Sequence, residues 1–72
     1  MYLVAVFRAR TQTLSFANLL ESYGVPVVVI NTPRHLNISC GISVKFPASF
    51  RHIAEGIISR RTFDTFAGIY QS

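Results

Sequence analysis

Hydrophobic residues occur in short runs separated by polar segments, and the spacing within each run predicts its secondary structure. Residues 2–7 form a continuous apolar run that is too short for a helix, so they predict a strand. Over residues 13–23 the apolar positions recur at helical spacing, which predicts a helix. Thr11 or Thr13 is the expected N-cap of this helix, and Gly24 is the expected left-handed residue at its end.

The second half of the chain continues the alternation of strands and helices. The β-branched run 25–30 predicts a second strand, and the strict alternation over 42–46 predicts a third strand that begins at or near Cys40. Pro47 suits the start of a second helix, and residues 66–70 predict a short fourth strand. The apolar stripe of that second helix consists of Phe50, Ile53, Ala54, Ile57 and Ile58.

The predicted order is strand, helix, strand, strand, helix, strand within one domain covering residues 1–72. This order is typical of an α+β, ferredoxin-like βαββαβ sandwich. Right-handed crossovers then give an antiparallel sheet with strand order 4-1-3-2 and both helices on one face.

The first two predicted strands are apolar on both sides, although two helices can cover only one face of the sheet. We therefore expect the open face, or the edge formed by the strand over 25–30, to be buried against a second copy of the chain. The sequence thus predicts a homodimer or a larger homo-oligomer.

The composition excludes several classes of protein. Half of the 72 residues are hydrophobic and 14% are charged, which excludes a disordered chain. A single cysteine excludes an internal disulfide. The run 2–7 is too short for a signal peptide or a membrane span, so we expect a cytoplasmic protein without a membrane partner.

Seven basic residues oppose three acidic ones, which gives a net charge of +4 and favours anionic partners. Six of the seven are arginines, which suit bidentate recognition of phosphate, sulfate or carboxylate. The predicted topology brings five of them to the same end of the sheet as Cys40. These five are Arg8, Arg10, Arg34, Arg60 and Arg61.

Cys40 has two interpretations, and both stay open at this point. Arginines and a helix N-terminus would stabilise its thiolate and lower its pKa below about 8.5, while Gly41 would let a ligand approach closely. Alternatively, Cys40 lies on the same side of the predicted strand as Ile42 and Val44, and it would then be a small structural residue of the core.

Four segments of the sequence carry a resemblance to a known family: 24–27, 31–34, 39–42 and 68–70. Over essentially the whole chain, the sequence resembles small bacterial proteins described as selenium/sulfur carrier protein-like. The resemblance implies a carrier or binding protein rather than a true enzyme, with Cys40 as the acceptor of sulfur or selenium. Its partners would be donor and acceptor proteins or small thiols. We expect no cofactor, because the sequence has no haem, flavin or nucleotide motif.

The resemblance carries over Cys40 as the motif cysteine and Pro33 and Arg34 as loop residues, and the predicted topology adds the other residues around the thiol. The most specific positions of the resemblance are Thr32, Pro33, Arg34, Cys40 and Gly41. The residues expected to bind an anion or stabilise the thiolate are Arg34, Arg8, Arg10, Gly41 and Thr11. Those expected to form a partner-binding loop are Thr32, Pro33 and His35.

The main alternative is an anion-binding or protein-interaction adaptor in which the cysteine is structural. A small phosphatase using Arg8 or Arg10 with Asn37, or a hydrolase pairing Cys40 with His35, is less well supported. We expect no nucleic acid partner, because the third strand lacks paired aromatic residues. We expect no metal site, because the two histidines lie at opposite ends of the predicted fold.

Overall fold

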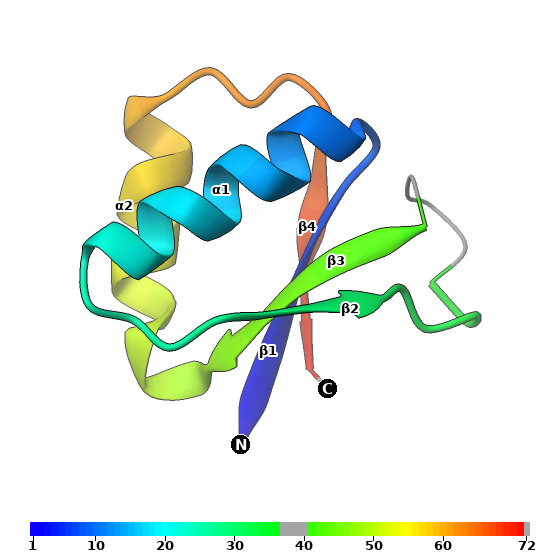
Figure 1. Cartoon of the computed structure of the whole chain (residues 1–72), viewed down its shortest axis with the longest axis horizontal. Coiled ribbons are helices and arrows are strands. Elements are labelled where there is room, and N and C mark those ends of the chain that lie inside the picture. The colour runs from blue at the N-terminus through cyan, green and yellow to red at the C-terminus, as the bar shows by residue number, and fades with distance from the viewer. Residues whose placement is uncertain (37–40, 72) are drawn as a thin grey trace.

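The computed structural model describes residues 1–36 and 41–71. Its elements are β1 (Tyr2–Phe7), α1 (Arg10–Ser22), β2 (Val28–Asn31), β3 (Ile42–Pro47), the 3-10 helix η1 (Ala48–Phe50), α2 (Arg51–Arg60) and β4 (Phe66–Gln71). The strands form an antiparallel sheet in the order β2-β3-β1-β4. Both helices pack against one face of this sheet (Figure 1). The predicted ferredoxin-like βαββαβ fold is confirmed.

The core lies between the helices and the central strand β1, whose alternate residues face the helices. Phe7 is fully buried, and its ring centroid lies 5.1 Å from that of Phe16, 5.3 Å from that of Phe63 and 5.5 Å from that of Phe66. Tilted aromatic rings at these separations add to the energy gained from burial alone. This aromatic cluster joins α1, the connection after α2, and the two strands β1 and β4.

Helix α1 begins at Arg10, three residues before the apolar periodicity starts, and the predicted threonine N-cap is wrong. The N-cap is Ala9, which makes no side-chain capping bond. Thr13 is instead buried within the first turns, where its hydroxyl donates to the Ala9 carbonyl at 3.2 Å. The Thr13 side chain therefore bonds to the helix backbone from inside the helix.

The end of α1 explains why β2 is shorter than its apolar run. Gly24 has a φ of +84° as predicted, its N–H donates to the Glu21 carbonyl, and the Val25 N–H donates to the Leu20 carbonyl. This pair of bonds is the Schellman ending of a helix. Val25 therefore belongs to the end of the helix and packs in the core, and β2 begins only at Val28.

The face of β1 opposite the helices is also buried within the single chain. Val4 and Val6 point away from the helices, yet only 1% and 0% of their surfaces are exposed. Val4 lies beside Tyr70 and Val6 beside Gly68 on β4. The Tyr70 hydroxyl donates to the Ala67 carbonyl at 3.0 Å, which lays its ring across Gly68. A second copy is therefore not needed to cover β1.

Exposed apolar side chains gather instead along β2. Val28 is 58% exposed and Val29 is 42% exposed. On α1, Leu14 is exposed as well. In the described part of the chain, no helix is both long enough and apolar enough to cross a membrane.

Candidate functional site

The segment that contains Cys40 leaves and rejoins the sheet between β2 and β3. Residues 37–40, and with them Cys40, lie outside the described residues. On either side of them, the Thr32 N–H donates to the Gly41 carbonyl at 3.0 Å. The hydroxyls of Thr32 and Ser43 share a hydrogen bond of 2.5 Å on the face away from the helices. These bonds fix both ends of the connection to the sheet.

Gly41 directly follows Cys40 and has a φ of +103°, a conformation that residues with a Cβ adopt only at a cost. No described atom lies within 4 Å of the position that its Cβ would occupy. Glycine is therefore required here by the backbone and not by a lack of space. The role expected of Gly41 from the sequence, to let a ligand approach closely, stays a prediction.

The predicted partner-binding residues form a turn immediately after β2. The Leu36 N–H donates to the Pro33 carbonyl at 3.1 Å, which closes the turn. Arg34 and His35 are exposed on it, whereas Thr32 and Pro33 are half-buried. Pro33 is the first residue of this turn, and its ring restricts the backbone φ there.

The other predicted anion-binding residues lie where β1 meets α1. Arg8, Arg10 and Thr11 are exposed. The backbone at this corner is held by the connection that precedes β4, because the Arg8 N–H donates to the Thr65 carbonyl at 2.9 Å. The two arginines therefore extend into solvent from a fixed backbone.

Gln12 supports this corner, and the sequence analysis missed it. Its Nε2 donates to Asp64 Oδ1 at 2.6 Å, and its Oε1 accepts hydrogen bonds from the Thr65 N–H at 3.2 Å and the Thr65 hydroxyl at 2.6 Å. More than 50 residues separate these partners, so no local pattern could reveal the bridge. Asp64 therefore helps to hold the corner where β1 meets α1.

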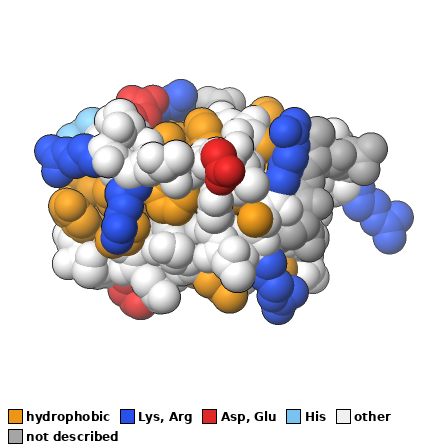
Figure 2. Space-filling model, turned by 90° about the horizontal axis from the view of Figure 1, so that it is seen from above, with side chains coloured by type: hydrophobic (Ala, Val, Ile, Leu, Met, Phe, Trp, Pro, Cys, Tyr) orange, Lys and Arg blue, Asp and Glu red, His pale blue; other side chains and the backbone are white. Residues whose placement is uncertain are grey.

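Figure 2 looks onto the end of the sheet where these segments lie. Lys and Arg side chains stand at separate places on this view, with hydrophobic and uncharged atoms between them. Within residues 1–36 and 41–71, the one ion pair joins Arg51 and Glu55 at 2.9 Å, on exposed side chains of α2. The predicted grouping of five arginines around Cys40 stays a prediction.

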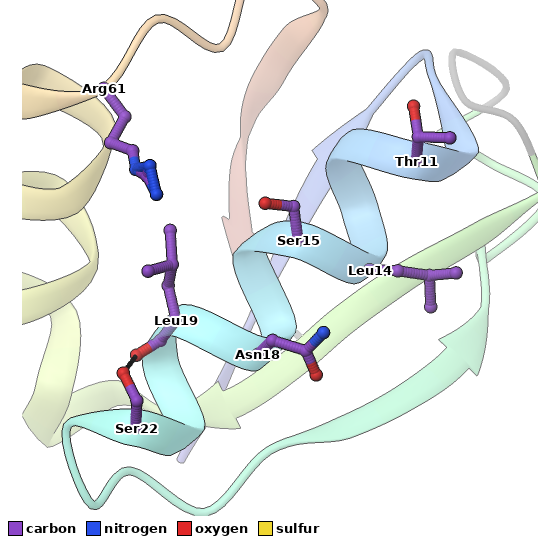
Figure 3. Close-up of a pocket in the computed structure, with 7 residues that line it drawn as sticks. All are labelled: Thr11, Leu14, Ser15, Asn18, Leu19, Ser22 and Arg61. Carbon is purple, nitrogen blue, oxygen red and sulfur yellow. Dashed lines mark hydrogen bonds between the residues drawn. The ribbon is translucent and has the colours of Figure 1, made fainter.

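An open groove of about 500 Å³ runs along the outer side of α1 (Figure 3). Arg61 extends from the end of α2 toward Leu19 of α1, and the groove is mostly apolar, with a few hydroxyl groups and one amide along it. Its residues are Thr11, Leu14, Ser15, Asn18, Leu19, Ser22 and Arg61. A guanidinium beside hydroxyl groups suits a carboxylate or phosphate.

Comparison with known families shows which family the chain belongs to. A family described as "Putative Se/S carrier protein-like" matches residues 2–71. The chain belongs to this family. The resemblance seen in the sequence is thereby confirmed, and the match includes both strands that flank Cys40. Searches of curated proteins and of solved structures find no match.

In this member of the Se/S carrier family, the predicted site residues fall into two groups. Thr32, Pro33, Arg34 and His35 occupy one side of the connection between β2 and β3, and Gly41 closes the other side. The second group, at the corner between β1 and α1, consists of Arg8, Arg10 and Thr11.

No three His, Cys, Asp or Glu side chains in the described ranges come close enough to bind a metal ion.

Proposed function

We propose that the chain carries sulfur or selenium on the side chain of Cys40. The observation that supports this most is the match to the Se/S carrier family over residues 2–71 in a sequence with one cysteine. A carrier needs one nucleophilic atom, and a thiolate is the best nucleophile that this sequence offers. Such a protein exchanges its cargo with a donor and an acceptor in a reducing compartment, for which we propose the cytoplasm.

The transfer step is a thiolate exchange. The Cys40 thiolate attacks the outer sulfur of a persulfide, R–S–SH, on the donor. The bond between Cys40 Sγ and that sulfur forms as the donor's S–S bond breaks, and the donor leaves as the thiolate R–S⁻. Because the transferred sulfur keeps its oxidation state, the step needs no oxidant or reductant, and R–S–SeH reacts in the same way.

Delivery reverses the same chemistry, since an acceptor thiolate attacks the outer sulfur on Cys40. The chain has no second cysteine that could displace the cargo from within. The exposed guanidiniums of Arg34, Arg8 and Arg10, together with Thr11, would stabilise the negative charge of the loaded persulfide. Thr32, Pro33 and His35 would contact the donor or acceptor.

The direct test is to load the purified chain with a low-molecular-weight persulfide and measure its intact mass. We expect a gain of about 32 Da, one sulfur atom, on the peptide that contains Cys40, and its complete loss in Cys40→Ser. Arg34→Gln should slow loading, whereas Arg51→Gln, which removes an arginine from α2, should not. An unmodified Cys40 after exposure to sulfur and selenium donors would overturn the proposal.

A second candidate function is an anion-binding adaptor, and the groove beside α1 favours it. Arg61 stands there over a mostly apolar surface that also carries the hydroxyls of Thr11, Ser15 and Ser22. Titration with inorganic phosphate or an acidic peptide should then shift the amide resonances of Ser15 and Leu19, and Arg61→Gln should abolish the shifts. An adaptor of this kind would bind equally well as Cys40→Ser, which separates it from the carrier.

A further inference from the structure

Strand β2 lies at one edge of the sheet, so it pairs with β3 on one side only. It has no charged residue, no proline and no bulge, which are the usual features that prevent an edge strand from pairing with another chain. Val28 and Val29 are also two of the most exposed large hydrophobic residues in the described part of the chain. The outer backbone groups of β2 and its two exposed valines are therefore both accessible to another strand.

The direction of the backbone groups along β2 follows from its pairing with β3. Thr32 donates its N–H to Gly41 across the ladder, and the register then pairs Ile30 with Ser43 and Val28 with Lys45. In an antiparallel ladder, residues that point toward one neighbour alternate with residues that point away from it. Val29 and Asn31 consequently direct their N–H and C=O groups outward, away from β3.

We propose that β2 pairs antiparallel with β2 of a second copy of this chain, with Val29 on the two-fold axis. This register lets Val29 exchange both of its backbone hydrogen bonds with the partner's Val29. It places Val28 directly beside the partner's Ile30 on the open face, because opposite residues of a ladder share a face. Two four-stranded sheets thereby become one continuous eight-stranded sheet.

The charges around β2 are complementary under this two-fold symmetry. Residues 22–33 contain no Asp, Glu, Lys or Arg, whereas Glu21 precedes this stretch and Arg34 follows it. Both side chains are exposed. Antiparallel pairing turns the end of β2 that leads to Arg34 toward the end of the partner's β2 that follows the partner's Glu21, so a chain of net charge +4 can associate through an uncharged strip.

The groove beside β2 on the open face fits the same partner. It has a volume of about 360 Å³ and is mostly apolar. Its lining residues are Tyr2, Pro26, Val28, Ile30, Lys45 and Pro47. Side chains of an added strand project alternately to the two faces of the sheet, so the partner's Val28 and Ile30 would extend the wall of this groove.

This proposal does not depend on sulfur chemistry, and its test keeps the two apart. Sedimentation of the full chain at micromolar concentration should give twice the 8.0 kDa mass of one chain, in Cys40→Ser as in the natural sequence. Val29→Pro removes an outward N–H and none of the bonds to β3, and Val28→Lys places an ammonium in the interface. Each should raise the dimer dissociation constant by roughly tenfold or more.

Three controls make the measurement specific. Val29→Thr keeps the outward N–H and should remain a dimer, and Ser59→Lys adds the same charge on α2 without effect on association. Arg34→Glu should weaken the dimer, and the added change Glu21→Arg should restore it. Far-UV circular dichroism shows whether each variant folds.

Amide hydrogen exchange gives a second reading for the same interface. The amides of Val29 and Asn31 should be protected in the natural chain and exchange at least tenfold faster in folded Val28→Lys. A monomer throughout the micromolar range would overturn the proposal. So would a dimer that survives both Val29→Pro and Val28→Lys, because it would use another surface.

Discussion

The two edge strands of the sheet, β4 and β2, differ in their length, in the regularity of their pairing and in their exposure. The β4 edge has six residues, an irregularity in its pairing beside Val6 and Phe7, and a glycine of φ +136° with the Tyr70 ring laid across it. The β2 edge has four residues in regular pairing, and its valines are exposed. Bulges and overlying side chains close an edge, whereas regular uncharged strands leave it open.

The two edge strands also differ in how much they contribute to the core of this small protein. The aromatic cluster around Phe7 lies under β1 and β4 and contributes much of the buried surface. The β2 side contributes less to the core, and it leads directly into the connection that contains Cys40. Changes on the β4 side should therefore affect unfolding, and changes on the β2 side should affect association and transfer.

The largest effect is expected from Phe7→Ala. Removing a fully buried ring that contacts three other phenylalanines should cost about 3–5 kcal/mol, which is comparable with the whole stability of a chain of this size. Val29→Ala, on the open edge, should cost less than about 1 kcal/mol. Urea unfolding followed by circular dichroism measures both, and equal costs would contradict the contrast between the edges.

Gly68→Ala tests how the β4 edge is closed. The new Cβ would lie 3.0 Å from the Tyr70 hydroxyl oxygen, and the backbone has a φ that favours glycine, so we expect a loss of about 1–3 kcal/mol. In a Tyr70→Ala background the steric part disappears. A double-mutant cycle should therefore show a coupling of about 1 kcal/mol between the two positions, and strict additivity would mean that only the backbone matters.

Gly41→Ala should have a smaller effect on stability and a larger one on reactivity. Its Cβ would meet no described atom, so only the φ of +103° opposes the change, at about 1–2 kcal/mol. A shift of the backbone next to Cys40 should also change the rate at which its thiol is alkylated. An unchanged rate would indicate that Gly41 does not position the thiol.

Val28→Thr should change the free energy of unfolding of the monomer by less than about 0.5 kcal/mol, because the side chain is more than half exposed. It keeps the β-branched shape that suits a strand. Thermal unfolding at low protein concentration, where a dimer dissociates, measures this. A large loss would show that β2 packs against the rest of its own chain more tightly than its exposure indicates.

Local patterns in the sequence predicted most of the fold. The continuous run of β1, the glycine at the end of α1 and the apolar stripe of α2 lie where the periodicity placed them. Each depends on residues that are close in the sequence, so composition and spacing are sufficient to find it. The sheet order then followed from the rules for short, right-handed connections.

Features that depend on distant residues could not be predicted in this way. The start of α1 is held by Gln12 and Thr65, which are 53 residues apart. Val4 and Val6 are buried between their neighbours in β3 and β4, which are distant in the sequence. The apolar strand β1 therefore suggested an uncovered face where the chain in fact covers itself, and the exposed valines lie on β2, at the edge of the sheet beyond β3.

For the candidate site, sequence reasoning found the residues that flank the thiol but not how they are held. The turn with Arg34 and His35, and the glycine after Cys40, were apparent from residue types alone. The bond between Thr32 and Gly41 and the shared hydroxyl bond to Ser43 depend on strand register. Register is fixed by the whole sheet and not by either strand.

The most direct test of the central claim follows one labelled sulfur atom from a donor persulfide through this chain to an acceptor thiol. The account predicts that the label appears transiently on the Cys40 peptide, then in the acceptor, and that Cys40→Ser transfers none of it. Label that reaches the acceptor at the same rate with Cys40→Ser, or that never appears on Cys40, would contradict a carrier role for this thiol.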